Sequence, residues 1–324
     1  MSKTCLLITE QFEPTADWLV EAMRERAVPC LRWNLDRFPI GSTLTYQASN
    51  DRFSAELCVD GRNLDLDEVG SIWCRGFRPS GFPDTLPQPD HRFAQLESQR
   101  ALDALMTTSD VLWVNHPQRH ARANSKPAQL CVAQRLGFDI PATVITNDPK
   151  RARALASRPN SRTIYKAMSQ SLELEDDKAL FTGIVTTKEL DALELIQISP
   201  GIFQTLVPKA YEIRVTVVGN RVFSGKINSQ ASPETEIDWR HRPFDMDPEP
   251  ITLPPKVETR IHQFMSEFGL VYGAFDFIVT PDRRYVFLEI NPAGQYMWME
   301  TQTKLPITAA LVDVLTAEEP RANH

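Results

Sequence analysis

Two short apolar runs near the C-terminus constrain the fold of this chain more than any other stretch. Residues 273–279 and 285–292 are rich in β-branched and aromatic side chains, and the short segment between them has turn composition. This pattern predicts two adjacent strands of a hairpin. In the second strand Glu289 and Asn291 are two residues apart, so we expect their side chains on one face, together with Phe287.

A metal site is the chemistry that this hairpin suggests. If Asp276 in the first strand lies opposite Glu289, two carboxylates and the amide oxygen of Asn291 converge on one small volume. Oxygen ligands of this kind suit Mg²⁺. The alternative is that both acids are solvated strand charges. Acidic residues embedded in otherwise apolar strands are costly to bury unless they are paired or bind a metal, which favours the metal site.

The length and composition of the chain argue against several classes of protein. Its 324 residues are too many for one core of usual size and predict two or three packed units. The net charge of -7 gives no support for nucleic-acid binding, which calls for a basic face. Five scattered cysteines without a C-x-x-C pair suggest neither disulfides nor a zinc site, and no apolar run is long enough to span a membrane. We therefore expect a cytoplasmic protein that binds neither nucleic acid nor membrane.

The N-terminal third of the sequence predicts a parallel α/β unit. Strands over residues 4–9 and 30–34 flank an amphipathic helix over 14–26, and a β-α-β order of this kind is typically parallel. The segment lacks G-x-G-x-x-G, so it gives little support for dinucleotide binding. A strand over 111–115 closes the unit, and His116-Pro117 marks a boundary because proline breaks the pattern.

The rest of the chain predicts a small α+β unit followed by a sheet-rich one. A helix over residues 124–137 has Lys126 in its first turn. A cation there is unfavourable with the helix dipole and suggests a bound anion, although a solvated lysine is the alternative. A strand over 163–167 carries Lys166, and the small unit ends near residue 200. The elements predicted beyond it are strands over 202–208, 212–218 and 222–227, a helix over 256–268, and the hairpin.

Taken in order, these signals resemble the ATP-grasp fold. The matching positions are Lys126, Lys166, residues 203–207, Glu212, Arg214, Asp276 and Glu289-Ile290-Asn291. More narrowly, the chain resembles the ATP-grasp peptide maturases that make graspetides, the microviridin-type ligases, at residues 113–117, 125–130, 140–143, 145–149, 237–240 and 287–295. The resemblance implies an α/β fold with an N-terminal parallel-sheet pre-ATP-grasp domain (1–117), a central lid subdomain (118–200) and a sheet-rich C-terminal subdomain with the metal site (201–324).

The resemblance also implies ATP and Mg²⁺ as cofactors and a set of residues that bind them. The implied nucleotide contacts are Lys126 and Lys166 to phosphate, Gln204 and the backbone of Leu206 and Val207 to adenine, and Glu212 to ribose. The implied Mg²⁺ ligands are Asp276, Glu289 and Asn291. Arg214 and Arg240 are candidate catalytic residues, because a guanidinium offers paired donors to a phosphoryl or carboxylate group. The alternative for Arg240 is a surface arginine in a polar loop.

The activity that the resemblance implies is activation of a carboxylate by ATP, giving an acyl phosphate that a hydroxyl or amine attacks. In the resembling ligases the carboxylate belongs to a ribosomal precursor peptide, whose leader docks on the enzyme and whose core forms ω-ester or ω-amide rings. The loop from Asn228 to Arg242 is the candidate leader dock, with Asp238 and Trp239 as contacts; a plain surface loop is the alternative. Residues 75–82 are expected to add a cationic, aromatic rim, and a homodimer is expected.

Two positions depart from the family pattern. The loop at residues 167–171 has no glycine to bring backbone N–H groups close to phosphate, and Lys304 stands where glycine is expected. Two other functions stay open: a ligase that joins free amino acids or small peptides, and an inactive ATP-grasp protein that only binds a peptide. The intact set of two lysines and three metal ligands argues against the inactive protein.

Overall fold

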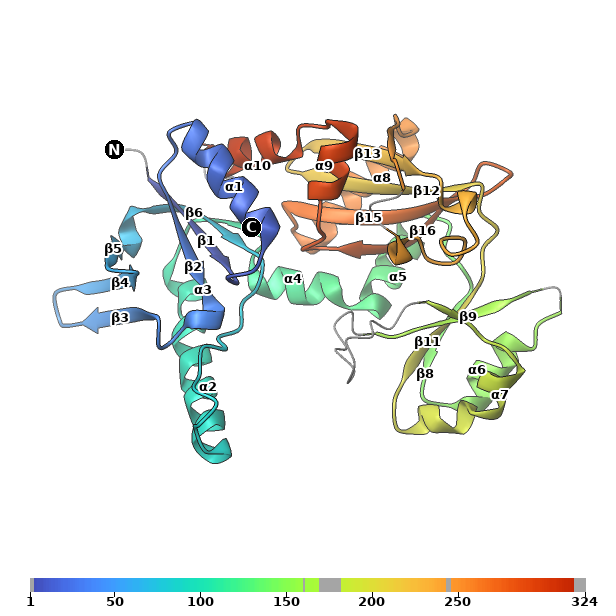
Figure 1. Ribbon diagram of the computed structural model, residues 1–324, viewed down its shortest axis with the longest axis horizontal. Coiled ribbons are helices and arrows are strands. Elements are labelled where there is room, and N and C mark those ends of the chain that lie inside the picture. The colour runs from blue at the N-terminus through green and yellow to red at the C-terminus, as the bar shows by residue number, and fades with distance from the viewer. Residues whose placement is uncertain (1–2, 160, 169–181, 243–245, 318–324) are drawn as a thin grey trace.

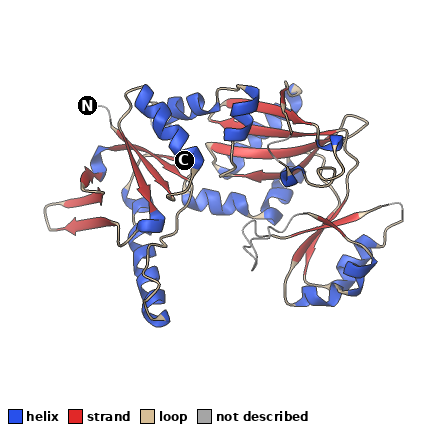
Figure 2. Ribbon diagram, viewed as in Figure 1, coloured by secondary structure: helices blue, strands red, loops and turns tan. Residues whose placement is uncertain are grey.

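The computed structural model describes residues 3–159, 161–168, 182–242 and 246–317 and has the predicted α/β architecture. Figure 1 shows an N-terminal unit, a large C-terminal sheet beside it and a small central unit set apart from both. Figure 2 shows that each unit combines strands and helices. No helix in the described part of the chain has both the length and the apolar character that crossing a membrane requires.

The N-terminal unit is built on a parallel sheet with strand order β2-β1-β6-β7. Its elements are β1 (Thr4–Thr9), α1 (Pro14–Glu25), β2 (Cys30–Asn34), β6 (Val69–Cys74), α2 (Gln88–Asp103), α3 (Leu105–Thr108) and β7 (Leu112–Val114). A separate antiparallel sheet contains β3 (Ser42–Ala48), β4 (Phe53–Val59) and β5 (Arg62–Asp65). Helix α1 buries Ala16, Leu19 and Met23 at helical spacing, and the predicted parallel β-α-β unit is confirmed.

The central unit is an antiparallel sheet with strand order β10-β9-β11-β8. Its elements are β8 (Thr143–Thr146), α6 (Pro149–Ala156), β9 (Thr163–Lys166), β10 (Gly183–Ile184), α7 (Thr187–Asp191) and β11 (Gly201–Thr205). It has a small core of its own around Leu155 and Phe203. Because β11 pairs with both β8 and β9, the unit continues past the predicted boundary at residue 200. Part of the predicted glycine-free loop, residues 169–171, lies outside the described residues.

The C-terminal unit is an antiparallel sheet with strand order β14-β13-β12-β15-β16. Its elements are β12 (Tyr211–Val218), β13 (Arg221–Ile227), β14 (Glu249–Pro250), α8 (Pro255–Phe268), β15 (Tyr272–Val279), β16 (Tyr285–Asn291), α9 (Met297–Thr303) and α10 (Ile307–Leu315). Helices α4 (Pro117–Asn124), α5 (Lys126–Arg135) and α8 share one core with this sheet. The predicted division placed α5 in the central unit; these contacts favour a division that keeps α4 and α5 with the C-terminal sheet.

A second core joins the N-terminal and C-terminal units. Helix α10 contacts α1, and its residues Ile307 and Leu311 are buried together with Leu19 of α1, Leu7 of β1 and Tyr272 of β15. Apolar side chains from both units therefore lose their contact with water in one shared cluster. The two large units form one packed body, to which the central unit is attached.

The hairpin of β15 and β16 orients its acidic side chains through a β-bulge. Asp276 pairs with Glu289 and Phe277 pairs with Phe287, so Leu288 is an extra residue in β16. One extra residue changes which face the following side chains occupy. Phe287 is consequently buried in the core, whereas Glu289 lines a cleft on the other face. The predicted pairing of Asp276 with Glu289 is confirmed, and the prediction that Phe287 shares their face is wrong.

Candidate active site

A cleft of about 550 Å³, partly open to solvent, separates the central sheet from the C-terminal sheet. One wall comes from β9, β11 and the segment that follows β11, and the other from β12, β15, β16 and the loop at residues 237–240. The residues predicted from the sequence that line it are Lys166, Gln204, Leu206, Val207, Glu212, Asp238, Trp239, Arg240, Asp276 and Glu289. Lys126 is ion-paired with Glu289, and Arg214 is ion-paired with Asp276. The fold thus brings most of the predicted set to one volume.

The two carboxylates lie on neighbouring strands, and each faces one cation. Lys126 Nζ lies 2.6 Å from Glu289 Oε2, and Arg214 Nη1 lies 3.0 Å and 2.8 Å from the two Asp276 oxygens. Burial raises the pKa of Asp276, an effect that Arg214 opposes only in part. Burial also acts on Glu289, but the charges of Lys126 and Lys166 outweigh it and lower its pKa to about 2. Of the two carboxyl groups, Glu289 therefore has the lower pKa and is the one that stays ionised.

Asp276, Glu289 and Asn291 fit the ligand chemistry of Mg²⁺, although they do not enclose an ion by themselves. Among the described residues, no three His, Cys, Asp or Glu side chains are grouped so that they could hold a metal. The Asn291 side-chain oxygen accepts a hydrogen bond from the Ala293 N–H at 2.9 Å, which orients the amide. Because Mg²⁺ usually keeps several waters and phosphate oxygens, two carboxylates and one amide are a sufficient protein contribution.

The side chain of Gln204 holds Lys166 in place beside the cleft. Lys166 Nζ donates to Gln204 Oε1 at 3.1 Å, and Gln204 Nε2 donates to Thr143 Oγ1 at 2.9 Å. The amide therefore connects β8, β9 and β11. Burial lowers the pKa of Lys166, against the nearby charge of Glu289. Lys126 and Lys166 thus act on the same carboxylate from two different units, an arrangement suited to holding phosphate between them.

Leu206 and Val207, which follow β11, line the cleft, and one backbone N–H of this segment is already hydrogen-bonded within the protein. The Leu206 N–H donates to the Arg162 carbonyl at 2.8 Å, so a ligand cannot use this donor without breaking that bond. The carbonyl of Leu206 and the backbone of Val207 are the groups that an adenine ring could contact here. The predicted adenine contact stays a prediction.

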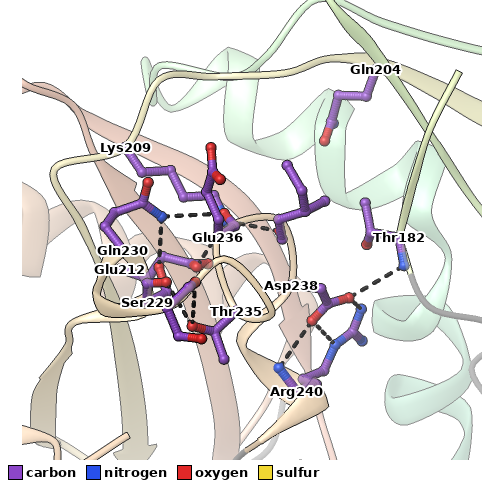
Figure 3. Close-up of polar contacts among 12 residues, drawn as sticks. Thr182, Gln204, Lys209, Glu212, Ser229, Gln230, Thr235, Glu236, Asp238 and Arg240 are labelled. Atoms are coloured by element: carbon purple, nitrogen blue, oxygen red, sulfur yellow. Dashed lines mark hydrogen bonds and ion pairs between the residues drawn. The ribbon is translucent and has the colours of Figure 1, made fainter. Parts of the chain in front are cut away.

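Glu212 is paired with a lysine that sequence reasoning missed. Lys209 Nζ donates to Glu212 Oε1 and to the Ile237 carbonyl, each at 2.9 Å, and Figure 3 shows both side chains among the polar groups around Ser229. Burial raises the pKa of Glu212, against the charge of Lys209. Lys209 precedes Glu212 by three residues, a spacing that predicts contact only within a helix. The segment is not helical, so the sequence carried no signal for this pair.

The loop around Asp238 directs its carboxylate into the protein, as Figure 3 shows. Asp238 accepts hydrogen bonds from Arg240 Nε at 2.8 Å, Arg240 Nη2 at 2.5 Å and the Thr182 N–H at 3.3 Å. Burial opposes ionisation of Asp238, but Arg240 lowers its pKa well below the usual range. Trp239 is 8% exposed, and its ring centroid lies 4.8 Å from that of Trp298. Arg240 lines the cleft, and its side chain is 44% exposed. Its catalytic role and leader binding by Asp238 and Trp239 stay predictions.

The N-terminal unit reaches the site through Gln295, another residue that sequence reasoning missed. Arg214 Nη2 donates to the Gln295 carbonyl at 3.3 Å, and Gln295 Nε2 donates to Glu13 Oε1 at 2.6 Å. Glu13 lies 3.2 Å from Arg75, and the two side chains are 12% and 7% exposed. Arg75 was expected in a rim facing the peptide, but it is buried in this network. Gln295 and Glu13 are 282 residues apart, and no local pattern predicts such a contact.

Comparisons with known proteins agree with this geometry. The profile of the MvdD pre-ATP-grasp domain matches residues 4–121. The structure is similar to an ATP-grasp ligase associated with ribosomal peptides from Chryseobacterium gregarium, solved with ADP and a leader and core peptide, at 27% identity and a TM-score of 0.89 over 98% of both chains. A comparison with curated protein sequences found no match.

Two macrocyclases from Microcystis aeruginosa are similar over nearly their whole length. MdnC, solved with the precursor peptide MdnA, is 29% identical with a TM-score of 0.86, and the match covers 96% of this chain and 99% of that one. MdnB is 30% identical with a TM-score of 0.82, and the match covers 97% and 99% of the two chains. The similarity thus extends over nearly the whole of each chain. The chain therefore belongs to the graspetide-type family of ATP-grasp peptide maturases.

Proposed function

We propose that this chain uses ATP and Mg²⁺ to activate Asp or Glu side chains of a ribosomal precursor peptide as acyl phosphates, and then closes ω-ester or ω-amide macrocycles. One observation carries the proposal: Lys126 and Lys166, from different units, both act on Glu289 beside the Asp276–Arg214 pair. Lys166, Asp276 and Glu289 line one cleft, and Lys126 is ion-paired with Glu289. Positioning and electrostatics of this kind supply most of the catalysis in phosphoryl transfer.

The residues divide between the nucleotide, the metal and the peptide. The two lysines bind phosphate oxygens, and Gln204 keeps Lys166 oriented through its 3.1 Å hydrogen bond. The adenine lies against Leu206 and Val207, and Glu212 accepts from the ribose hydroxyls. The Mg²⁺ ligands are Asp276, Glu289 and Asn291. Bound ATP supplies the phosphoryl group, which turns a carboxylate oxygen of the peptide into a leaving group.

Arg214 and Arg240 are the candidates for holding the transferred phosphoryl group or the peptide carboxylate. Each guanidinium already makes bonds to one acid, at 2.8 Å for Arg214 with Asp276 and 2.5 Å for Arg240 with Asp238. These bonds fix the planes of both guanidiniums, and a planar guanidinium offers paired donors to an oxyanion. The hydroxyl or amine that attacks the activated carboxylate comes from a Thr, Ser or Lys side chain of the same peptide.

A precursor peptide is the proposed partner, and its leader is proposed to dock at the loop from Asn228 to Arg242. Support comes from a second pocket of about 880 Å³ that this loop lines with Asn228, Ser232, Thr235 and Arg242. Solved relatives are bound to leader, core or precursor peptides. Asp238 and Trp239, which belong to the same loop and line the cleft, are the proposed contacts of the leader. A homodimer in the cytoplasm is also proposed.

The test is mass spectrometry of a candidate precursor peptide, chosen from the reading frames that neighbour the gene of this protein. With ATP and Mg²⁺ we expect the peptide to lose one water for each ring that closes. Glu289→Gln and Lys166→Met should abolish this loss, and Lys150→Met, which changes an exposed lysine of α6, should retain it.

Two results would favour the other functions. ADP release with free amino acids and no change in the peptide would indicate a ligase for small metabolites. Peptide binding without ADP release, at the same level in Glu289→Gln, would indicate an inactive binding protein.

A further inference from the structure

Two buried amides outside the cleft contact the strand that carries Glu289 and Asn291. They are Gln129 of α5, which is 1% exposed, and Asn115 at the junction of β7 and α4, which is 2% exposed. Neither residue lines the cleft. Buried polar side chains are retained only when their hydrogen bonds are satisfied, and both of these side chains use donors and acceptors on the backbone of the metal-binding hairpin.

Gln129 occupies the outer edge of β16 at Ile290, further along the strand than the bridge between Val286 and Asp139. Its Oε1 accepts from the Ile290 N–H at 3.0 Å, and its Nε2 donates to the Ile290 carbonyl at 2.9 Å. β16 is the last strand of its sheet, so the amide takes the place of the next strand in the ladder. Nε2 also donates to the Ala123 carbonyl at 2.7 Å, which ties the end of α4 to the same point. Gln129 lies three residues after Lys126, on the same side of α5.

Asn115 joins the two strands of the same hairpin at the end away from the turn. Its Nδ2 donates to the carbonyls of Tyr272 and Pro292, each at 2.8 Å. Its Oδ1 accepts from the N–H groups of Val271 and Tyr272 at 2.8 Å and 3.0 Å. One side chain therefore joins the start of β15 to the end of β16, and it does so from the N-terminal unit.

The two amides hold the backbone at alternate positions. Gln129 binds the backbone of Ile290, and Asn115 binds the backbone of Pro292. Asn291 lies between these two residues, and Glu289 directly precedes Ile290. Because side chains alternate along a strand, fixing the backbone at these two positions fixes the direction of the two ligand side chains. Gln129 also sets the distance between α5 and β16, across which Lys126 meets Glu289 at 2.6 Å.

We propose that Gln129 and Asn115 are positioning residues for the metal site. They clamp β16 so that Glu289 faces the cleft in register with Lys126 and Asn291 leaves the same side of the strand. The inference rests on the proposed function, because it presumes that these side chains bind a divalent cation. Residues that orient metal ligands without touching the metal typically contribute about 10–100-fold to metal affinity.

The test uses Mn²⁺ as a paramagnetic probe with ADP, and free Mn²⁺ is counted by electron paramagnetic resonance. Gln129→Met keeps the length of the side chain and removes both of its bonds to Ile290, so we expect about 10–100-fold weaker Mn²⁺ binding. ADP binding measured without metal should stay at the wild-type level. The control is Gln99→Met in α2. Gln99 also donates to a backbone carbonyl, that of Phe77 at 3.2 Å, but it does not contact the hairpin, so Mn²⁺ binding by this variant should equal that of the wild type.

A second pair of variants covers the case in which Gln129→Met does not fold, as judged by circular dichroism. Gln129→Asn keeps the amide but is too short to reach Ile290, and Asn115→Asp keeps the acceptor and loses both donations; each should weaken Mn²⁺ binding. Wild-type Mn²⁺ affinity in the folded variants would overturn the clamp and leave the proposed function standing. Failure of the wild-type protein to bind Mn²⁺ with ADP would overturn both.

Discussion

Replacing Arg75 by methionine tests whether the contact between the N-terminal unit and Gln295 stabilises the protein. The Arg75 and Glu13 side chains are 7% and 12% exposed and lie 3.2 Å apart. Removing the guanidinium leaves Glu13 buried with Gln295 Nε2 and the Ala16 N–H as donors. Breaking a buried pair from one side costs about 3–5 kcal/mol. At about 2 °C per kcal/mol for a large domain, the melting temperature should fall by about 6–10 °C.

The control for the buried Arg75–Glu13 pair is an ion pair whose two side chains are exposed. Arg24 and Glu21 lie 2.5 Å apart, but their side chains are 74% and 53% exposed, so Arg24→Met should leave the melting temperature close to that of the wild type. Both variants are measured by thermal melting, together with the double variant Arg75→Met/Glu13→Gln. The double variant should be more stable than Arg75→Met, because it removes the unpaired charge. Equal melting temperatures for Arg75→Met and Arg24→Met would refute the reasoning.

Three further predictions concern single side chains. Lys209→Met leaves the Glu212 carboxylate buried without its cation and should weaken binding of a non-hydrolysable ATP analogue about tenfold, the equivalent of about 1.4 kcal/mol; unchanged affinity by calorimetry would separate Glu212 from the nucleotide. Trp239→Ala removes a ring that packs at a tilt against Trp298 and should destabilise the protein by about 3–5 kcal/mol; an unchanged melting temperature with loss of leader binding would instead make Trp239 a peptide contact. Lys304 has φ of 60°, so Lys304→Gly should raise stability by about 1 kcal/mol, and a lower melting temperature would contradict this.

The element order and most of the site could be predicted because their signals are local. Lys126 in the first turn of a helix, Lys166 on a strand and the Glu289-Ile290-Asn291 run are each readable within a few residues. The pairing of Asp276 with Glu289 followed from two adjacent strands and a turn. Lys304 also shows a local signal, since the position where the family pattern has glycine adopts a left-handed conformation that glycine favours.

What could not be predicted depends on non-local geometry or on a single inserted residue. The bulge at Leu288 changes the face of Phe287, and nothing in an alternating pattern marks where one extra residue will be accommodated. The membership of β11 in the central sheet depends on pairing between residues far apart in the sequence, such as Ile202 with Lys166 and Gln204 with Ile164. The Glu13–Gln295 contact joins opposite ends of the chain.

The shared core of α1 and α10 has a consequence for how the cleft opens. The backbone links the central unit to the packed body at residues 141–142 and 206–210. Phe138 and Asp139, just before the first link, still pack against and pair with the C-terminal sheet, and the central unit carries its own small core. Swinging it about these two links would separate Lys166 from Glu289 without exposing the apolar side chains that unite the two ends of the chain. Lys166 and Gln204 would move with the central unit while Asp276 and Glu289 stayed with the packed body, so opening would divide the polar lining of the cleft between the two parts.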